Sequence, residues 1–181
     1  MKVKNYTEEI EVPEGTSVQL DGTILTVSKE KETVIRDFAN QKIKIKKEAN
    51  KIILHVPLMT KKEKTTLGAF AAHIRNMLTG VNNVLVYKLK VCSGHFPMNI
   101  SVSGQELSVK NFTGEKVPRT LRIRDGVQVK IEGDNITIKS ADKEKAGQAA
   151  GAIELLCKRP GFDKRIFQQG IYITEKAGKT A

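Results

Sequence analysis

Aromatic residues are scarce in this sequence, which contains no tryptophan, three tyrosines and six phenylalanines. Proteins that recognise single-stranded nucleic acid stack its bases on aromatic side chains, and no strand-like segment here carries the required aromatic spacing. Acidic residues are also outnumbered, with 20 Asp and Glu against 31 Lys and Arg and a formal net charge of +11. The composition therefore disfavours a base-stacking reader of single strands but favours a nucleic acid or another anionic surface as the partner.

Long apolar runs and paired cysteines are both missing. No run approaches the roughly 20 apolar residues that span a bilayer, and the start at Met1 to Lys4 lacks the apolar region of a signal peptide. Cys92 and Cys157 have no CxxC neighbour, which is typical of small buried thiols rather than of a disulfide or a metal site. These features predict a cytoplasmic protein with free thiols and no membrane partner.

Catalytic motifs are missing as well. The sequence contains no glycine-rich phosphate loop, no dinucleotide-binding fingerprint and no nucleophile elbow. The histidines His55, His73 and His95 stand apart, without the spacing of metal ligands. We therefore predict that the chain is not an enzyme and needs no metal or other cofactor.

An internal repeat organises the chain. The same order of apolar and turn residues recurs at a spacing of roughly 80 residues, which is too long for a solenoid unit and suits a small domain. The sequence therefore predicts tandem domains over residues 1–83 and 84–181. The matched segments are 17–27 with 99–109, 42–45 with 126–129, and 68–74 with 147–153.

Each copy reads as several strands followed by one helix. Alternating apolar residues and tight turns predict antiparallel strands. A capping box at Thr60 and Glu63 begins the first predicted helix, while Ser140 caps the second, which ends at Pro160. Residues 84–92 are predicted to close the first sheet and open the second. The fold class is α+β, with two duplicated domains that each pack a small, mostly antiparallel sheet against one helix.

The segment 158–170 carries four cations and a single acid, Asp163. Lys158, Arg159, Lys164 and Arg165 surround a Pro-Gly turn, which predicts a shaped loop that binds a polyanion. The alternative is a solvated turn at a helix end, where cations also suit the helix dipole.

A comparison of the two copies favours the binding function. When residues 80–86 are written over 161–167, neutral side chains stand opposite Lys164 and Arg165. The halves also differ in net charge, at +4 for residues 1–83 and +7 for residues 84–181. The second domain is therefore the better candidate for contact with the polyanion.

Further cations extend the predicted surface. Lys88 and Lys90 alternate with apolar residues and should share one strand face, while Lys116 and Arg119 lie in a loop with two turn-forming residues. Each could equally be the solvent face of a sheet. The segment 175–181 is predicted to be a polar tail. Phosphate and shape recognition by loops is the mode used on folded RNA, so structured RNA is the predicted partner.

Several motifs together resemble the large-subunit ribosomal protein six family in its archaeal form, over the whole chain. They are Gly94 to Pro97, Val109 to Lys116, and Lys164 to Tyr172. The resemblance implies a structural protein of the large ribosomal subunit whose second domain binds ribosomal RNA near the stalk base and the sarcin–ricin region, beside neighbouring ribosomal proteins and translation factors. It implies RNA contacts by His95, Lys116, Arg119, Lys158, Arg159, Lys164 and Arg165. A chromatin-like nucleic-acid-binding protein is the alternative.

Overall fold

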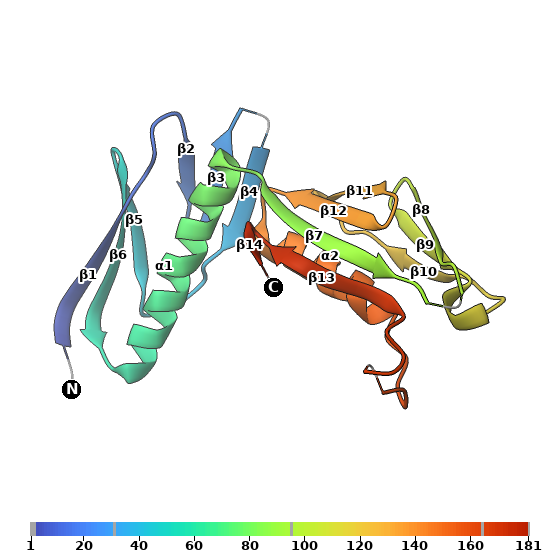
Figure 1. Cartoon of the computed structure of the whole chain (residues 1–181). Coiled ribbons are helices and arrows are strands. Elements are labelled where there is room, and N and C mark those ends of the chain that lie inside the picture. The colour runs from blue at the N-terminus through green and yellow to red at the C-terminus, as the bar shows by residue number, and fades with distance from the viewer. Residues whose placement is uncertain (1–2, 31, 95, 164, 181) are drawn as a thin grey trace. The chain divides into compact units, whose positions relative to one another are not determined.

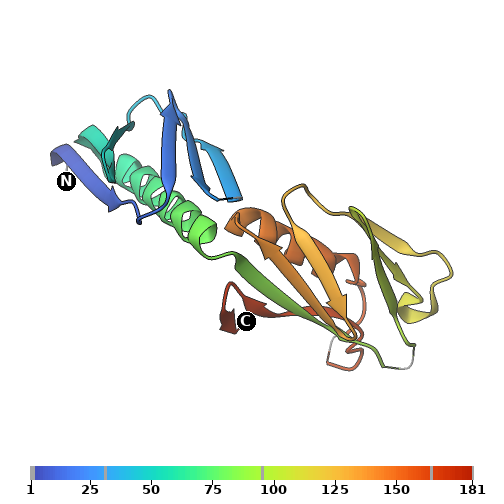
Figure 2. The same ribbon diagram turned by 90° about the horizontal axis from the view of Figure 1, so that it is seen from above.

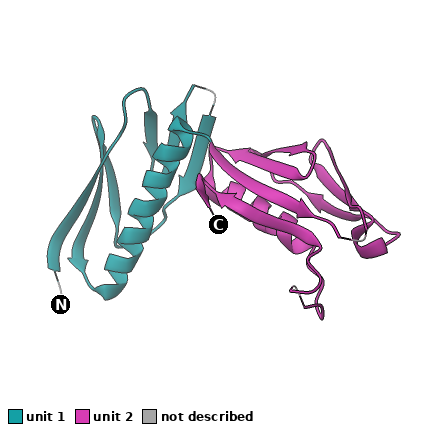
Figure 3. Ribbon diagram, viewed as in Figure 1, with its two compact units in different colours: residues 1–84 teal, residues 85–181 magenta. Residues whose placement is uncertain are grey.

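Tight turns between alternating strands build antiparallel sheets in both halves of the chain. Gly22 and Gly104 stand at equivalent hairpin turns with φ of +61° and +59°, a conformation that glycine adopts without strain. The computed structural model describes residues 3–30, 32–94, 96–163 and 165–180. It divides the chain into two units, residues 1–84 and 85–181, which Figure 3 shows in separate colours.

The first unit contains antiparallel sheets in the orders β1-β6-β5 and β2-β3-β4, with the helix α1 packed against them (Figure 1). Buried residues, most of them hydrophobic, alternate with more exposed residues along these strands, as the period of two predicts. The elements are β1 (Val3–Glu11), β2 (Ser17–Asp21), β3 (Ile24–Lys29), β4 (Glu32–Asp37), β5 (Lys44–Glu48), β6 (Lys51–Met59) and α1 (Lys61–Asn82).

The predicted capping box begins α1. The backbone N–H of Thr60 donates to Glu63 Oε2 at 3.1 Å, and Glu63 accepts a second bond from Lys42 Nζ at 2.7 Å. One face of the helix buries Leu67, Ile74 and other apolar side chains against the sheets. The capping residues were therefore predicted correctly from sequence, and α1 continues through Gly80 to Asn82.

The second unit repeats this arrangement and adds strands to it. Its sheets have the orders β11-β12-β7-β13-β14 and β10-β9-β8, and α2 packs on β7, β12 and β13. Figure 2 shows the same elements from above. The elements are β7 (Leu85–Cys92), β8 (Asn99–Ser103), β9 (Glu106–Lys110), the 3₁₀ helix η1 (Phe112–Gly114), β10 (Arg119–Arg122), β11 (Gln128–Glu132), β12 (Asn135–Ser140), α2 (Lys143–Leu156), β13 (Gly170–Lys176) and β14 (Lys179–Thr180).

Three local predictions were wrong. The strand β7 pairs with β12 and β13, so it belongs to the second sheet and does not close the first. Asp142 caps α2 by accepting from the backbone N–H of Glu144 at 2.9 Å, whereas Ser140 donates to Gly126 O. The predicted tail forms a hairpin, because β14 pairs with the end of β13.

Small residues in α2 let the helix lie close to its sheet. A Cβ added at Gly147 would lie 3.4 Å from the hydroxyl oxygen of Tyr87 on β7. The core beneath the helix contains Leu89, Ile138 and Ile153, all fully buried. Cys157 is buried, Cys92 is half-buried and both are free thiols, as predicted.

The α+β fold class and its duplication are confirmed by this architecture, because each unit packs one α-helix against antiparallel sheets. Neither helix in the described part of the chain combines the length and the apolar character needed to cross a membrane.

Candidate nucleic-acid interface

The connection that follows the helix differs sharply between the two units. Residues 83–84 join α1 to β7, whereas residues 157–169 join α2 to β13. In Figure 1 this longer segment leaves the second unit as a projecting loop. The loop is long because α2 ends at Leu156, several residues before Pro160. The predicted end of the helix was therefore too late.

The position-by-position comparison of residues 80–86 with 161–167 is therefore wrong. Val81 lies inside α1 and is 4% exposed, whereas Phe162, the residue aligned with it in that comparison, lies in the loop and is 41% exposed. Asn82 also has a structural role, because its side-chain amide donates to Thr16 Oγ1 at 3.0 Å and accepts from Lys29 Nζ at 2.6 Å. The difference between the copies is an added loop rather than a set of exchanged side chains.

Lys158 and Arg159 open this loop. Lys158 is exposed, and Arg159 places its guanidinium 4.4 Å from the ring centre of Phe162. Arg159 Nη1 also donates to Thr113 Oγ1 at 3.1 Å, which ties the loop to η1. Thr113 has φ of +50°, an unusual conformation for a β-branched residue. Such strained residues concentrate at functional sites.

Arg165 pairs within the loop. Its Nη2 lies 2.7 Å from Asp163 Oδ2, and its backbone N–H donates to Asp163 Oδ1 at 2.9 Å. The hydrogen bond from Arg165 lowers the pKa of the Asp163 carboxyl and raises that of the guanidinium. Arg165 remains 89% exposed as a side chain, so its pairing is a weak, solvated one. Lys164 lies outside the described residues.

Arg119 is held among several partners. Its Nε and Nη2 donate to the two carboxylate oxygens of Glu115 at 2.8 and 2.7 Å, and its Nη1 donates to Leu156 O at 2.7 Å. The guanidinium also lies 4.3 Å from the ring centre of Phe112. The hydrogen bonds from Arg119 lower the pKa of the Glu115 carboxyl. Arg119 therefore joins the 111–119 loop to the end of α2.

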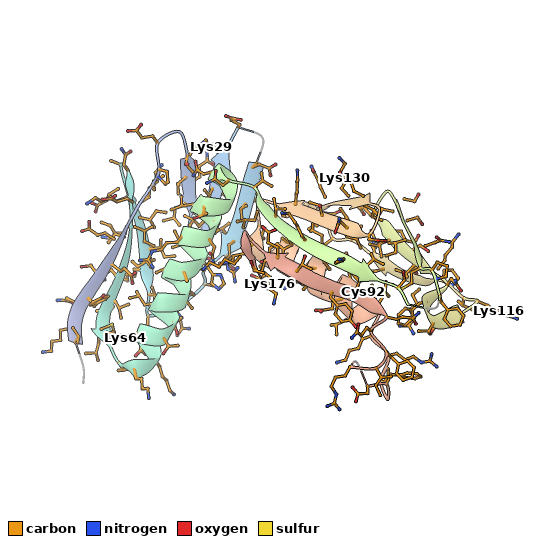
Figure 4. The ribbon with its side chains drawn as sticks, in the orientation of Figure 1. Lys29, Lys64, Cys92, Lys116, Lys130 and Lys176 are labelled. Carbon is orange, nitrogen blue, oxygen red and sulfur yellow. The ribbon has the colours of Figure 1, made fainter. Side chains whose placement is uncertain are left out.

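The other predicted cations fall on two elements. Lys88 and Lys90 project from the exposed face of β7, where Lys88 Nζ pairs with Glu175 Oε2 at 2.7 Å. Lys116 is exposed in the loop after η1, and Figure 4 shows it beside that helix. His95 lies outside the described residues. The prediction that these side chains contact RNA is not tested by their geometry.

A cavity of about 870 Å³ brings part of this set together. Lys90, Lys158 and Arg159 line it, together with Phe96, Phe162 and Phe167. Sequence reasoning missed the aromatic residues, because Phe96 lies far from Phe162 and Phe167 in the chain and none of the three follows a strand period. The only available signal was their place in the same turn-rich segments as the cations.

Comparisons with known proteins agree with one another. The model of the family "Ribosomal protein L6" matches this chain over residues 12–83 and again over 96–170. Proteins named "Large ribosomal subunit protein uL6" from Methanococcus vannielii and Sulfurisphaera tokodaii are each 40% identical to it, over 172 and 177 residues. These alignments cover 95% and 97% of this chain, and 94% and 95% of the respective relatives.

Proposed function

Since this chain belongs to the ribosomal protein L6 family, we propose that it holds folded large-subunit ribosomal RNA through the basic loops of its second unit. The family consists of structural proteins of the large ribosomal subunit, not of enzymes. The predictions of the family in its archaeal form, of a non-enzymatic role and of a place in cytoplasmic ribosomes are thereby confirmed. The chromatin-like alternative is set aside for the same reason.

The observation that carries the proposal is the loop 157–169, which the second repeat has and the first lacks. The first repeat ends with α1, and residues 83–84 lead directly into β7 of the second sheet, so this repeat has no counterpart of the loop or of β13. Residues 158–163 and 165–168 of this loop are exposed and include several cations, and exposed charge on a loop is a feature of binding sites.

The proposed contacts are of two kinds. Lys90, Lys116, Lys158 and Lys164 would reach RNA phosphates as point charges, and Arg159 would do so as a planar donor. Arg119 positions the 111–119 loop by bonding to Glu115 and Leu156 O, and so supports these contacts indirectly. Lys88, His95 and Arg165 complete the proposed surface.

We further propose that the chain lies near the stalk base and the sarcin–ricin region, beside neighbouring ribosomal proteins and the docking site of translation factors. The family resemblance of the Gly94–Pro97 and Lys164–Tyr172 motifs supports this location. Crosslinking of the protein to RNA within large subunits would test it, because contacts confined to other RNA regions would contradict it.

The main experiment reverses charge in the loop. We expect the variant Lys164→Glu/Arg165→Glu to melt like the parent yet stay free of large subunits in a sucrose gradient, because the two proposed phosphate contacts would be lost at about 1–3 kcal/mol each and replaced by charge repulsion. Exposed substitutions of this kind change stability by only about ±0.5 kcal/mol.

Asn82 and Asn83 cannot serve as the control, because Asn82 is bonded within the fold. Lys44→Glu/Lys46→Glu is a better one: both lysines are exposed on β5 of the first unit, and the charge change is identical. We expect this variant to enter large subunits. Equal losses for the two variants, or normal sedimentation of the loop variant, would contradict the proposal.

A further inference from the structure

Three phenylalanine rings gather at the surface of the second unit. Phe96, Phe162 and Phe167 are 45%, 41% and 53% exposed, and all three line the cavity of about 870 Å³. Exposed aromatic side chains that cluster in a concave surface mark a binding site rather than a folding requirement. Phosphate binding by lysines gives these rings no role, so they need an explanation of their own.

The rings are held in fixed positions. Phe162 and Phe167 pack edge to face, with ring centres 4.8 Å apart and planes at 77°. Arg159 covers one side of the Phe162 ring. Phe96 lies against the backbone at Gly114, where an added Cβ would be 3.4 Å from its ring. The cavity therefore presents preorganised aromatic surfaces beside a guanidinium plane, which also stacks on flat ligands.

An unsatisfied amide lies in the same cavity. The side-chain nitrogen of Gln169 is buried and has no hydrogen-bond partner among the described residues. Such a donor is costly unless something accepts from it. A ligand with a ring nitrogen or carbonyl oxygen would supply the acceptor, and Gln169 lines the cavity.

The charges around the cavity favour an anionic ligand. Lys90, Lys158 and Arg159 line it, against the acids Asp134 and Glu154. Neither lysine forms a salt bridge within the part of the chain that the structure describes. A flat, acceptor-bearing ring joined to a phosphate combines all of these features, and a nucleotide has that chemistry.

We propose that this cavity receives one unpaired nucleotide of the RNA, with its base stacked on the Phe162 and Phe167 pair and its phosphate near Lys158. The proposal rests on the proposed function and goes further, because it assigns base contact to a protein otherwise expected to read phosphates and shape. Proteins that bind folded RNA commonly take splayed-out bases from loops and bulges in this way.

The test distinguishes base stacking on the rings from phosphate binding by the cations. Phe162→Leu/Phe167→Leu keeps apolar bulk but removes both rings, so its affinity for deproteinised large-subunit RNA should fall about 10- to 100-fold. The dependence of log affinity on log salt should keep the parent slope, because no phosphate contact is lost. The matched variant Lys158→Gln should instead reduce the slope by about one. Phe162→Tyr/Phe167→Tyr, which keeps both rings, should bind like the parent.

A second readout needs no variant. Short-wavelength ultraviolet irradiation of the parent complex, followed by nuclease digestion and mass spectrometry, should place a nucleotide adduct on Phe162 or Phe167, since photocrosslinking requires close contact between ring and base. Thermal melting of the leucine variant should match the parent because both rings are exposed.

The outcomes distinguish the two proposals. If the parent fails to bind this RNA, the proposed function itself is wrong. If the parent binds with a steep salt slope but the leucine variant binds equally well and no adduct forms on either ring, the nucleotide pocket is wrong and phosphate binding stands. If the leucine variant binds RNA normally yet is lost from large subunits, the rings contact a neighbouring protein, which also overturns the nucleotide pocket.

Discussion

Glu63 shows how one side chain can be fixed by its neighbours. It is 7% exposed, and hydrogen bonds from Lys42 and Thr60 hold its pKa at about 2, against an ordinary value of 4.5. A carboxyl group whose pKa is lower in the folded chain than in the unfolded chain stabilises the fold at pH values above its unfolded pKa. This stabilisation is lost as the pH falls through the folded pKa. We expect Glu63→Gln to melt a few degrees below the parent at pH 7, and the two melting curves to converge between pH 4.5 and 2.

The matched variant for this measurement is Glu14→Gln. Glu14 is exposed and lies away from the start of α1, so its variant should follow the parent at every pH. A constant difference between Glu63→Gln and the parent from pH 7 to 2 would mean that the ionised carboxylate does not stabilise α1.

Single cations were easier to find in the sequence than to assign a role. Lys90, Lys116 and Lys158 are exposed, in agreement with their alternating or loop positions. Arg119 looked equivalent to them, yet its guanidinium is bound to Glu115 and the end of α2. The sequence could not reveal this, because Leu156 is brought beside Arg119 only by the packing of α2 on β10.

At the scale of elements, Arg119 connects three of them: the loop after η1, the start of β10 and the last turn of α2. It satisfies a carbonyl at the helix end, where such groups have no partner within the helix. Arg119→Lys keeps the charge but cannot make the bidentate and carbonyl bonds together. We expect a loss of about 1–3 kcal/mol in the free energy of unfolding, measured by guanidinium denaturation.

Arg122→Lys is the control, because Arg122 is exposed on the same strand. Its unfolding free energy should stay within about 0.5 kcal/mol of the parent. A similar loss in both variants would show that charge on β10, rather than the bonds of Arg119, stabilises the unit.

The strands and the start of α1 could be predicted because they depend on local signals. The alternation of apolar and polar residues predicted the positions of β2, β3 and β6, and the capping box of Thr60 and Glu63 predicted the start of α1. The end of α2 was predicted too late, because Pro160 was taken as the end of the helix, whereas a proline also disfavours helical conformation in the residues just before it and α2 ends at Leu156. That error shifted the comparison of the two copies and hid the added loop.

At the scale of the whole molecule, excess charge is spread over both units but is larger in the second, at +7 for residues 84–181 against +4 for residues 1–83. Internal pairing reduces what is available for RNA, because Lys88, Arg119 and Arg165 each face a carboxylate. His95 carries no formal charge at neutral pH. The predicted sites taken to neutralise phosphates are Lys90, Lys116, Lys158 and Arg159, which form no salt bridge with the described residues, and Lys164, which lies outside those residues.

These five cations predict the salt dependence of binding. Each phosphate neutralised on a double-stranded site contributes about −0.9 to the slope of log affinity against log salt, so the parent should give about −4 to −5 on deproteinised large-subunit RNA. If the paired cations also neutralised phosphates, the slope would steepen to about −7. Filter binding across a range of potassium chloride concentrations distinguishes these values. A slope near zero would mean that counterion release does not drive binding, and the basic loops would then have no electrostatic role in holding the RNA.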